Sequence, residues 1–139
     1  MLVAALASLG GACGAPEAAI RADLCTDLGH LEATIAALAS PDPQTRIGIV
    51  RGNLERLDPT FGNVSRSELA TPDVLDRLLQ AHVDYRDQFR SIGDDDRYEA
   101  LGPAAPAAGR GLQLAFVAVQ GDLGCFGREA RLLSPSPSG

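Results

Sequence analysis

The chain has 139 residues, of which 12 are arginine or lysine and 18 are aspartate or glutamate, so its net charge is −6 at pH 7. Binding to DNA or RNA requires a basic surface, and this acidic balance therefore argues against a nucleic-acid partner. The length allows one domain with a modest core, which a hydrophobic content of 45% with few aromatic residues predicts to be mainly aliphatic.

Residues 1–14 have the features of an export leader. Residues 2–9 (LVAALASL) form an apolar run too short to span a membrane, and small residues follow it up to Cys13. This order resembles a lipoprotein signal, in which Cys13 would be lipidated and would give the chain its membrane attachment. Two features depart from that pattern: no basic residue precedes the run, and Gly10 stands where a branched aliphatic residue is usual. There are two alternatives. Ordinary signal peptidase could cleave after Gly14, or the segment could be an apolar arm that is never removed.

A first helix is predicted from Pro16 to the segment SPDP at residues 40–43. Proline is favoured at the first helical position, and an acidic residue such as Glu17 is favourable in the first turn. The following apolar residues are spaced by three and four, which places them on one helical face: Leu24, Leu28, Leu31, Ile35 and Leu38.

A second helix is predicted to begin at Asp42 and Pro43, which have the residue types of a helix cap and a first position. Its apolar face consists of Ile47, Val50, Leu54 and Leu57. Gly48 and Gly52 weaken this helix by about 1 kcal/mol each relative to alanine. Residues 58–70, which contain Pro59, Gly62 and Asn63, are predicted to be a connection with at most a short turn.

A third helix is predicted to be capped by Thr71, to start at Pro72 and to end at Gly93. Its inward face carries Leu75, Leu78, Leu79, His82, Phe89 and Ile92. Residues 94–111, first acidic and then rich in proline, alanine and glycine, are predicted to be a second connection. Residues 112–126 fit a helix, although residues 112–120 could also form a buried strand. A helix is favoured, because no other segment shows the alternation of a partner strand.

Four helices in this order predict an all-α, antiparallel bundle with up-down-up-down topology, in residues 15–133, followed by a disordered tail at residues 134–139. In such a bundle the start of the first helix lies beside the end of the fourth. Cys25 and Cys125 occupy these two places, so we expect a disulfide between them. Pairing of Cys13 with Cys25 is disfavoured, because a helix from Pro16 onward would hold them about 15 Å apart.

No residue pattern of a catalytic site, metal site or cofactor site is recognisable. Neither His30 nor His82 has a Cys, His or Glu three or four positions later on the same face, and Asp27, three residues before His30, does not by itself make a site, so neither histidine predicts a metal centre. His82, Tyr85 and Phe89 mark a candidate pocket between helices. The glycines near the last helix permit close helix approach or reflect composition alone: Gly109, Gly111, Gly121, Gly124 and Gly127.

The leader, the cysteine near the start of the first helix and the cysteine near the end of the last resemble small helical bacterial lipoproteins and secreted proteins of unknown function. The resemblance implies a helical fold and export, either lipid-anchored at the cell envelope or secreted, and it transfers no site residues. We expect a non-enzymatic domain with a structural or protein-binding role. A small-molecule or metal binder with a pocket near His82 is the alternative, and an enzyme using Asp, Glu and His groups is a weaker one.

Overall fold

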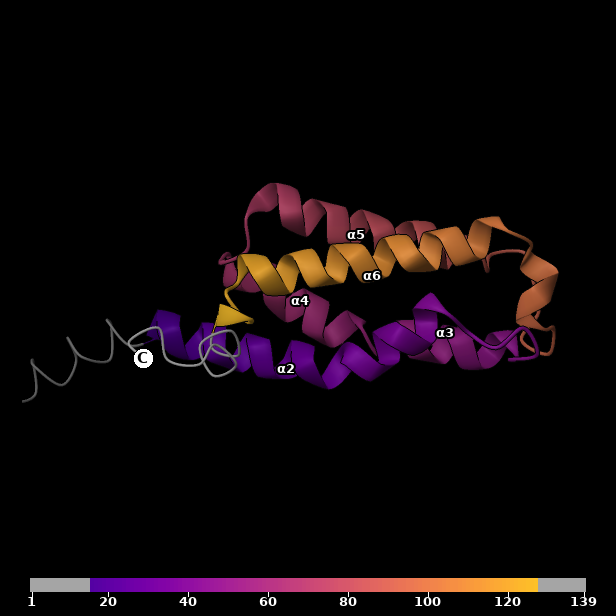
Figure 1. The fold of residues 1–139 in the computed structure, drawn as a ribbon, viewed down its shortest axis with the longest axis horizontal. Helices are drawn as coiled ribbons and strands as arrows, with labels where there is room; N and C mark the ends of the chain where they lie inside the picture. The colour runs from indigo at the N-terminus through magenta and orange to yellow at the C-terminus, as the bar shows by residue number, and fades with distance from the viewer. Residues whose placement is uncertain (1–15, 128–139) are drawn as a thin grey trace, which may run out of the picture.

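The structure is a computed structural model that describes residues 16–127, and these residues form an all-helical fold. The elements in chain order are α2 (Pro16–Ala39), α3 (Ile47–Glu55), α4 (Asp58–Ser67), α5 (Pro72–Asp87), the 3-10 helix η1 (Tyr98–Leu101) and α6 (Ala104–Asp122). α3 and α4 together run back along α2, so the helices form the expected four-helix bundle with up-down-up-down topology (Figure 1). The expected leader with Cys13 and the expected tail at residues 134–139 lie outside the described residues.

The expected disulfide between Cys25 and Cys125 is present, and it joins α2 to the turn that follows α6. The two Cα atoms lie 5.3 Å apart, although the residues are 100 positions apart in the sequence. α2 and α6 run antiparallel along each other, which brings the start of the chain's first described helix to the end of its last (Figure 1). The cross-link therefore closes a loop that contains nearly the whole bundle.

Several helix boundaries agree with the sequence prediction. α2, which contains the first described residue, Pro16, ends directly before Ser40, and α5 starts at Pro72. Residues 112–122 are helical, which settles the choice between helix and strand. Thr71 precedes α5 as expected, but its side chain does not cap that helix; its hydroxyl donates to Asp122 Oδ1 at the end of α6, over 2.7 Å.

Two segments predicted to be connections are helical. Residues 58–67 form α4, and α6 begins at Ala104, eight positions before the predicted start. The prolines in these segments misled the prediction, because proline is compatible with the first turn of a helix, where no N–H is needed. Pro59 is the second residue of α4 and Pro106 the third residue of α6. Pro59 also ends α3, because it has no N–H to donate to the Glu55 carbonyl four residues earlier.

The predicted start of the second helix was wrong as well. Asp42 does not cap a helix but accepts a hydrogen bond from the Gln44 N–H, over 2.8 Å, in a local turn. α3 begins at Ile47, whose N–H donates to the carbonyl of Asp96, over 2.9 Å. The acidic loop after α5 thus supplies the acceptors that the first N–H groups of a helix need. α5 itself ends at Asp87, earlier than the predicted end at Gly93.

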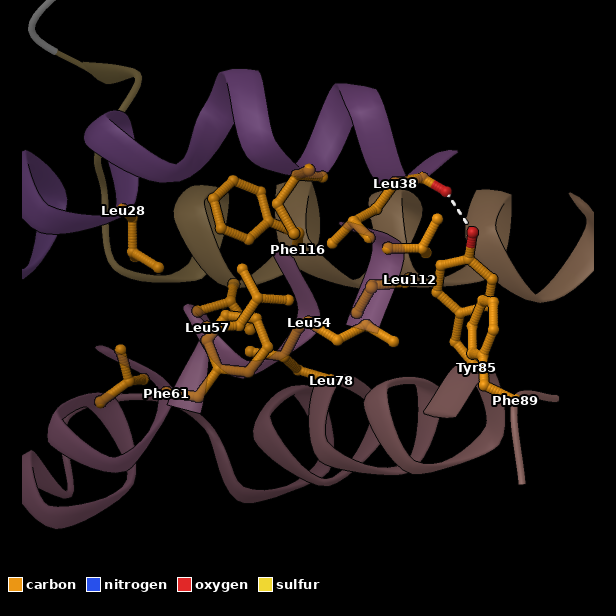
Figure 2. Packing of buried hydrophobic residues seen from close by; sticks show 14 of the residues in the cluster. Leu28, Leu38, Leu54, Leu57, Phe61, Leu78, Tyr85, Phe89, Leu112 and Phe116 are labelled. Atoms are coloured by element: carbon orange, nitrogen blue, oxygen red, sulfur yellow. Dashed lines mark hydrogen bonds between the residues drawn. The ribbon is translucent and has the colours of Figure 1, made fainter. Parts of the chain in front are cut away.

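The core lies between the helices and consists mainly of leucine and phenylalanine side chains (Figure 2). A pair of tyrosine hydroxyl groups is buried within it. The Tyr85 hydroxyl donates to the carbonyl oxygen of Leu38 in the last turn of α2, over 2.5 Å, and accepts from the Tyr98 hydroxyl, over 3.1 Å (Figure 2). Burial raises the pKa of Tyr85, which keeps the phenol protonated. These bonds remove the cost of burying a hydroxyl without a partner.

Gly109 allows α6 to approach this hydrogen bond closely. A Cβ atom at position 109 would lie 2.8 Å from the Leu38 carbonyl oxygen and 3.2 Å from the Tyr85 hydroxyl oxygen, whereas a Cβ at Gly111, two residues further on, would meet nothing within 4 Å. Only the first glycine is therefore required by packing, and the second costs the helix conformational entropy without a packing benefit.

Replacing these two glycines should have opposite effects on stability. G109A should lower the free energy of unfolding by about 1–3 kcal/mol, because the added methyl group overlaps a backbone carbonyl and displaces Tyr85. G111A should raise it by up to about 1 kcal/mol through helix propensity. Urea denaturation of both variants measures the difference; equal effects of the two substitutions would contradict the close approach at Gly109.

Loss of the disulfide should strongly destabilise the domain. We expect C25A/C125A to lower the free energy of unfolding by about 2–5 kcal/mol, because the unfolded chain regains the freedom that the long closed loop removes. Denaturation of the wild-type protein with and without a reductant provides the second measurement. The double variant itself is the control, since its midpoint should not respond to the reductant.

Candidate functional site

A pocket of about 460 Å³ opens between α5 and the segment where α3 meets α4. His82 lies on α5, whereas Phe89, which was predicted to lie within the same helix, follows the end of α5 at Asp87. The side chains from the two sides include Leu54, Glu55, Asp58, His82, Arg86 and Phe89. Its volume lies within the range of small-molecule sites in proteins. The helix break at residues 56–57 places both Glu55 and Asp58 on its rim.

His82 is the buried polar group of this pocket, with 5% of its surface exposed. Its Nε2 lies 3.3 Å from the carbonyl oxygen of Leu54 and 3.7 Å from Oδ1 of Asp58, and its ring packs edge-on against Phe61. Burial lowers the pKa of His82, and Arg86 lowers it further, against the opposing effects of the Leu54 carbonyl and Asp58. The ring is therefore neutral at neutral pH and donates its Nε2–H to Leu54.

Tyr85 is not part of the pocket, in contrast to the prediction. Its side chain is fully buried, packs against Phe89 and points to the carbonyl oxygen of Leu38 (Figure 2). His82 and Tyr85 are three residues apart, and this spacing gave them adjacent positions on the predicted inward face. The two side chains nevertheless donate to different backbone carbonyls: His82 to that of Leu54 and Tyr85 to that of Leu38.

The charged side chains around the pocket differ in how they are engaged. Arg51 donates to the Asp94 carboxylate and to two carbonyl oxygens just after α5, so it joins α3 to that loop. Arg90 forms an ion pair with Asp87, over 2.7 Å, within the same turn. Within the described part of the chain, neither Arg86 nor Glu55 takes part in an ion pair.

The Asp58 carboxylate and His82 Nε2 are not joined by a hydrogen bond. Among residues 16–127, Asp58 is the carboxylate that approaches His82 Nε2 as an ion-pair partner, and it does so over 3.7 Å. The same nitrogen carries the proton that is donated to Leu54. A neutral histidine whose Nε2 is occupied in this way cannot use that atom as a base.

A second surface feature is the outward face of α6, which we define as Gly111, Leu114, Val117, Ala118 and Gly121. All five residues are exposed, with 73% of the surface of Leu114 and 47% of that of Val117 accessible. No residue from 111 to 121 carries a charge. Shallow grooves flank the face, one of about 300 Å³ towards α5 and one of about 260 Å³ towards α2.

The sequence analysis missed Glu55, Asp58 and Arg86 as pocket residues. Arg86 follows His82 by four positions, and this spacing on a helix was a usable signal for one side of the pocket. Glu55 and Asp58 gave no such signal, because residues 58–70 were taken for a connection. Only the helix break between them brings their side chains to the same rim.

Three further findings concern similarity to known proteins, metal sites and membrane-spanning helices. No family model, curated protein or solved structure matched the chain. Across residues 16–127, no group of three or more His, Cys, Asp or Glu side chains is arranged to hold a metal ion. In the same range, none of the helices combines the length and apolarity needed to cross a membrane.

The buried His82 should make stability depend on pH. The pKa of His82 is lower in the folded state than in the unfolded chain. The contribution of the neutral ring to the free energy of unfolding is therefore complete above about pH 6.5 and is lost as the pH falls towards the pKa of the folded state. The free energy of unfolding should therefore decrease from about pH 7.5 to about pH 5. H82Q should flatten this slope. H30Q, which replaces an exposed histidine of α2, should keep it; equal slopes in all three proteins would contradict the assignment.

Proposed function

We propose that the chain is a non-enzymatic, exported helical domain that serves a structural or protein-binding role at the cell envelope. The observation that carries the protein-binding part is the outward face of α6. Leu114 and Val117 remain exposed there, between small residues and without any charge. Contiguous exposed apolar surface of this kind is typical of sites that another protein covers.

The composition of this face fits the packing of a partner helix. Gly111, Ala118 and Gly121 allow another backbone to approach closely, and Leu114 offers a side chain that can enter a groove on the partner. The grooves on both sides of α6 can in turn receive side chains from the partner. Helix-in-groove recognition uses this combination of an apolar face and flanking depressions.

Export is supported by the apolar run before Cys13 and by the disulfide. Disulfides persist in oxidising compartments outside the cytoplasm and are rare inside it. Cys13 would provide a lipid anchor if the leader is processed as a lipoprotein signal, and free secretion follows if cleavage occurs after Gly14. Either route brings the Cys25–Cys125 pair into a compartment where it forms and persists.

Site-specific photo-crosslinking in the producing bacterium tests the protein-binding role. A photoreactive residue at position 114 should give a discrete adduct with one partner, whereas the same residue at Ala33, an exposed position of α2, should not. V117D should abolish the adduct at position 114, because a buried unpaired charge would disfavour the interface.

The same V117D substitution should leave the melting temperature nearly unchanged, since Val117 is half exposed and lies outside the core. Equal crosslinking from positions 114 and 33, or an adduct that persists in V117D, would count against the outward face of α6 as the binding surface.

Binding of a small molecule in the pocket beside His82 is a second candidate function. The specific observation in its favour is a pocket of about 460 Å³ that reaches the buried His82 and the apolar side chains of Leu54 and Phe89. The two functions use different surfaces of the bundle, because the pocket lies across α5 from α6. They can therefore be tested independently.

A further inference from the structure

Two walls of opposite charge face the pocket beside His82. The end of α3 and the start of α4 supply Glu55 and Asp58, whereas α5 and the turn after it supply Arg86 and Arg90. Arg51 also lines the α3 side and Asp87 the α5 side, but both are engaged, Arg51 by Asp94 and Asp87 by Arg90. The influence of both walls reaches His82, whose pKa is raised by Asp58 and lowered by Arg86. The two charged walls thus meet over the same buried side chain.

These charges are not neutralised across the pocket. In the described range, the ion pair of Arg90 is made with Asp87 on its own side, and Arg86 and Glu55 form none. Among the described residues, three contacts join the two walls. Arg51 donates to carbonyl oxygens just after α5. His82 donates to the Leu54 carbonyl, and Asp58 approaches His82, which is neutral at neutral pH. None of these contacts engages Glu55 or Arg86. The acidic and the basic wall therefore remain open to the two ends of a ligand.

The base of the pocket between the walls is apolar. Leu54 and Phe89 are almost fully buried, with 2% and 1% of their surfaces exposed, and His82 beside them has its Nε2–H engaged by a backbone carbonyl. A complementary ligand would have an apolar middle, one anionic end and one cationic end. The pocket volume suits a molecule of about the size of a small metabolite or short peptide.

We propose that this pocket binds a small zwitterion of the free amino acid or short peptide class, with its carboxylate at Arg86 and Arg90 and its ammonium group at Glu55 and Asp58. The inference rests on the second candidate function, because it names the ligand class of that same pocket. Guanidinium groups bind a carboxylate through paired hydrogen bonds. An ammonium group has three donors, which two carboxylates can accept.

The test is a titration of the disulfide-bonded protein with the dipeptide leucyl-leucine. Binding is followed through changes in the backbone amide resonances of the protein. Leucyl-leucine has both charged termini and apolar side chains that can cover Leu54 and Phe89. N-acetyl-leucyl-leucine lacks the ammonium group, and leucyl-leucinamide lacks the carboxylate. Each analogue should bind at least about tenfold more weakly, because one wall then loses its charge-assisted hydrogen bonds.

Single substitutions on the two walls identify which end of the probe each wall holds. R86Q should weaken binding of leucyl-leucine by about tenfold and leave binding of the amide unchanged, since the amide has no carboxylate to lose. E55Q should weaken leucyl-leucine and leave the N-acetyl analogue unchanged, for the corresponding reason. R110Q on α6 is the matched control: Arg110 is exposed, does not line this pocket and should not affect any of the three probes.

The outcomes separate the inference from the function on which it rests. The zwitterion is supported if leucyl-leucine binds most tightly of the three probes and if R86Q and E55Q each weaken its binding. Equal affinity for all three probes, with resonance changes around the pocket, overturns the zwitterion but leaves ligand binding in place. The absence of resonance changes with every probe at millimolar concentration overturns both.

Discussion

The hydrogen bond from the Tyr85 hydroxyl to the Leu38 carbonyl is the contact on which the geometry of the bundle depends. It joins the last turn of α5 to the last turn of α2, at a place where both residues are buried. The fourth helix comes against this bond through Gly109, where a side chain would overlap the carbonyl oxygen. A polar group this deep has few acceptable arrangements, and it therefore fixes the relative positions of three helices more narrowly than leucine packing can.

The successes and failures of the sequence prediction have specific physical causes. The apolar stripes of α2 and α5 and their starting prolines predicted two helices well, because periodicity and a first-turn proline indicated the same boundaries. Pro59 and Pro106 were read as marks of connections, although each lies in a first turn as Pro16 and Pro72 do. The missing information was the tertiary packing of these segments. α4 is helical because Phe61 and Val64 are buried against the bundle, and a polar segment with two such residues gives only a weak periodic signal.

The candidate site was predictable to a smaller extent than the fold. The inward position of His82 followed from the helical stripe, but its acceptor is the carbonyl of Leu54, a backbone atom that no sequence pattern identifies. The rim residues Glu55 and Asp58 are brought to one place by a helix break whose exact position depends on packing. The outward face of α6 was hidden for another reason: its leucine, valine and small residues continue the composition of the buried side, so the sequence alone does not distinguish the two sides of this helix.

The pairing of the first and last helices has a consequence for the order of events in the cell. α2 packs more closely against α6 than against α3 or α4, and its disulfide partner is residue 125. During synthesis, the surface that α2 needs does not exist until the last part of the chain has left the ribosome. The amino-terminal half cannot reach its final packing early. If the domain is exported, as proposed above, this delay keeps the polypeptide in a threadable state until translocation, and oxidation then closes the bundle behind it.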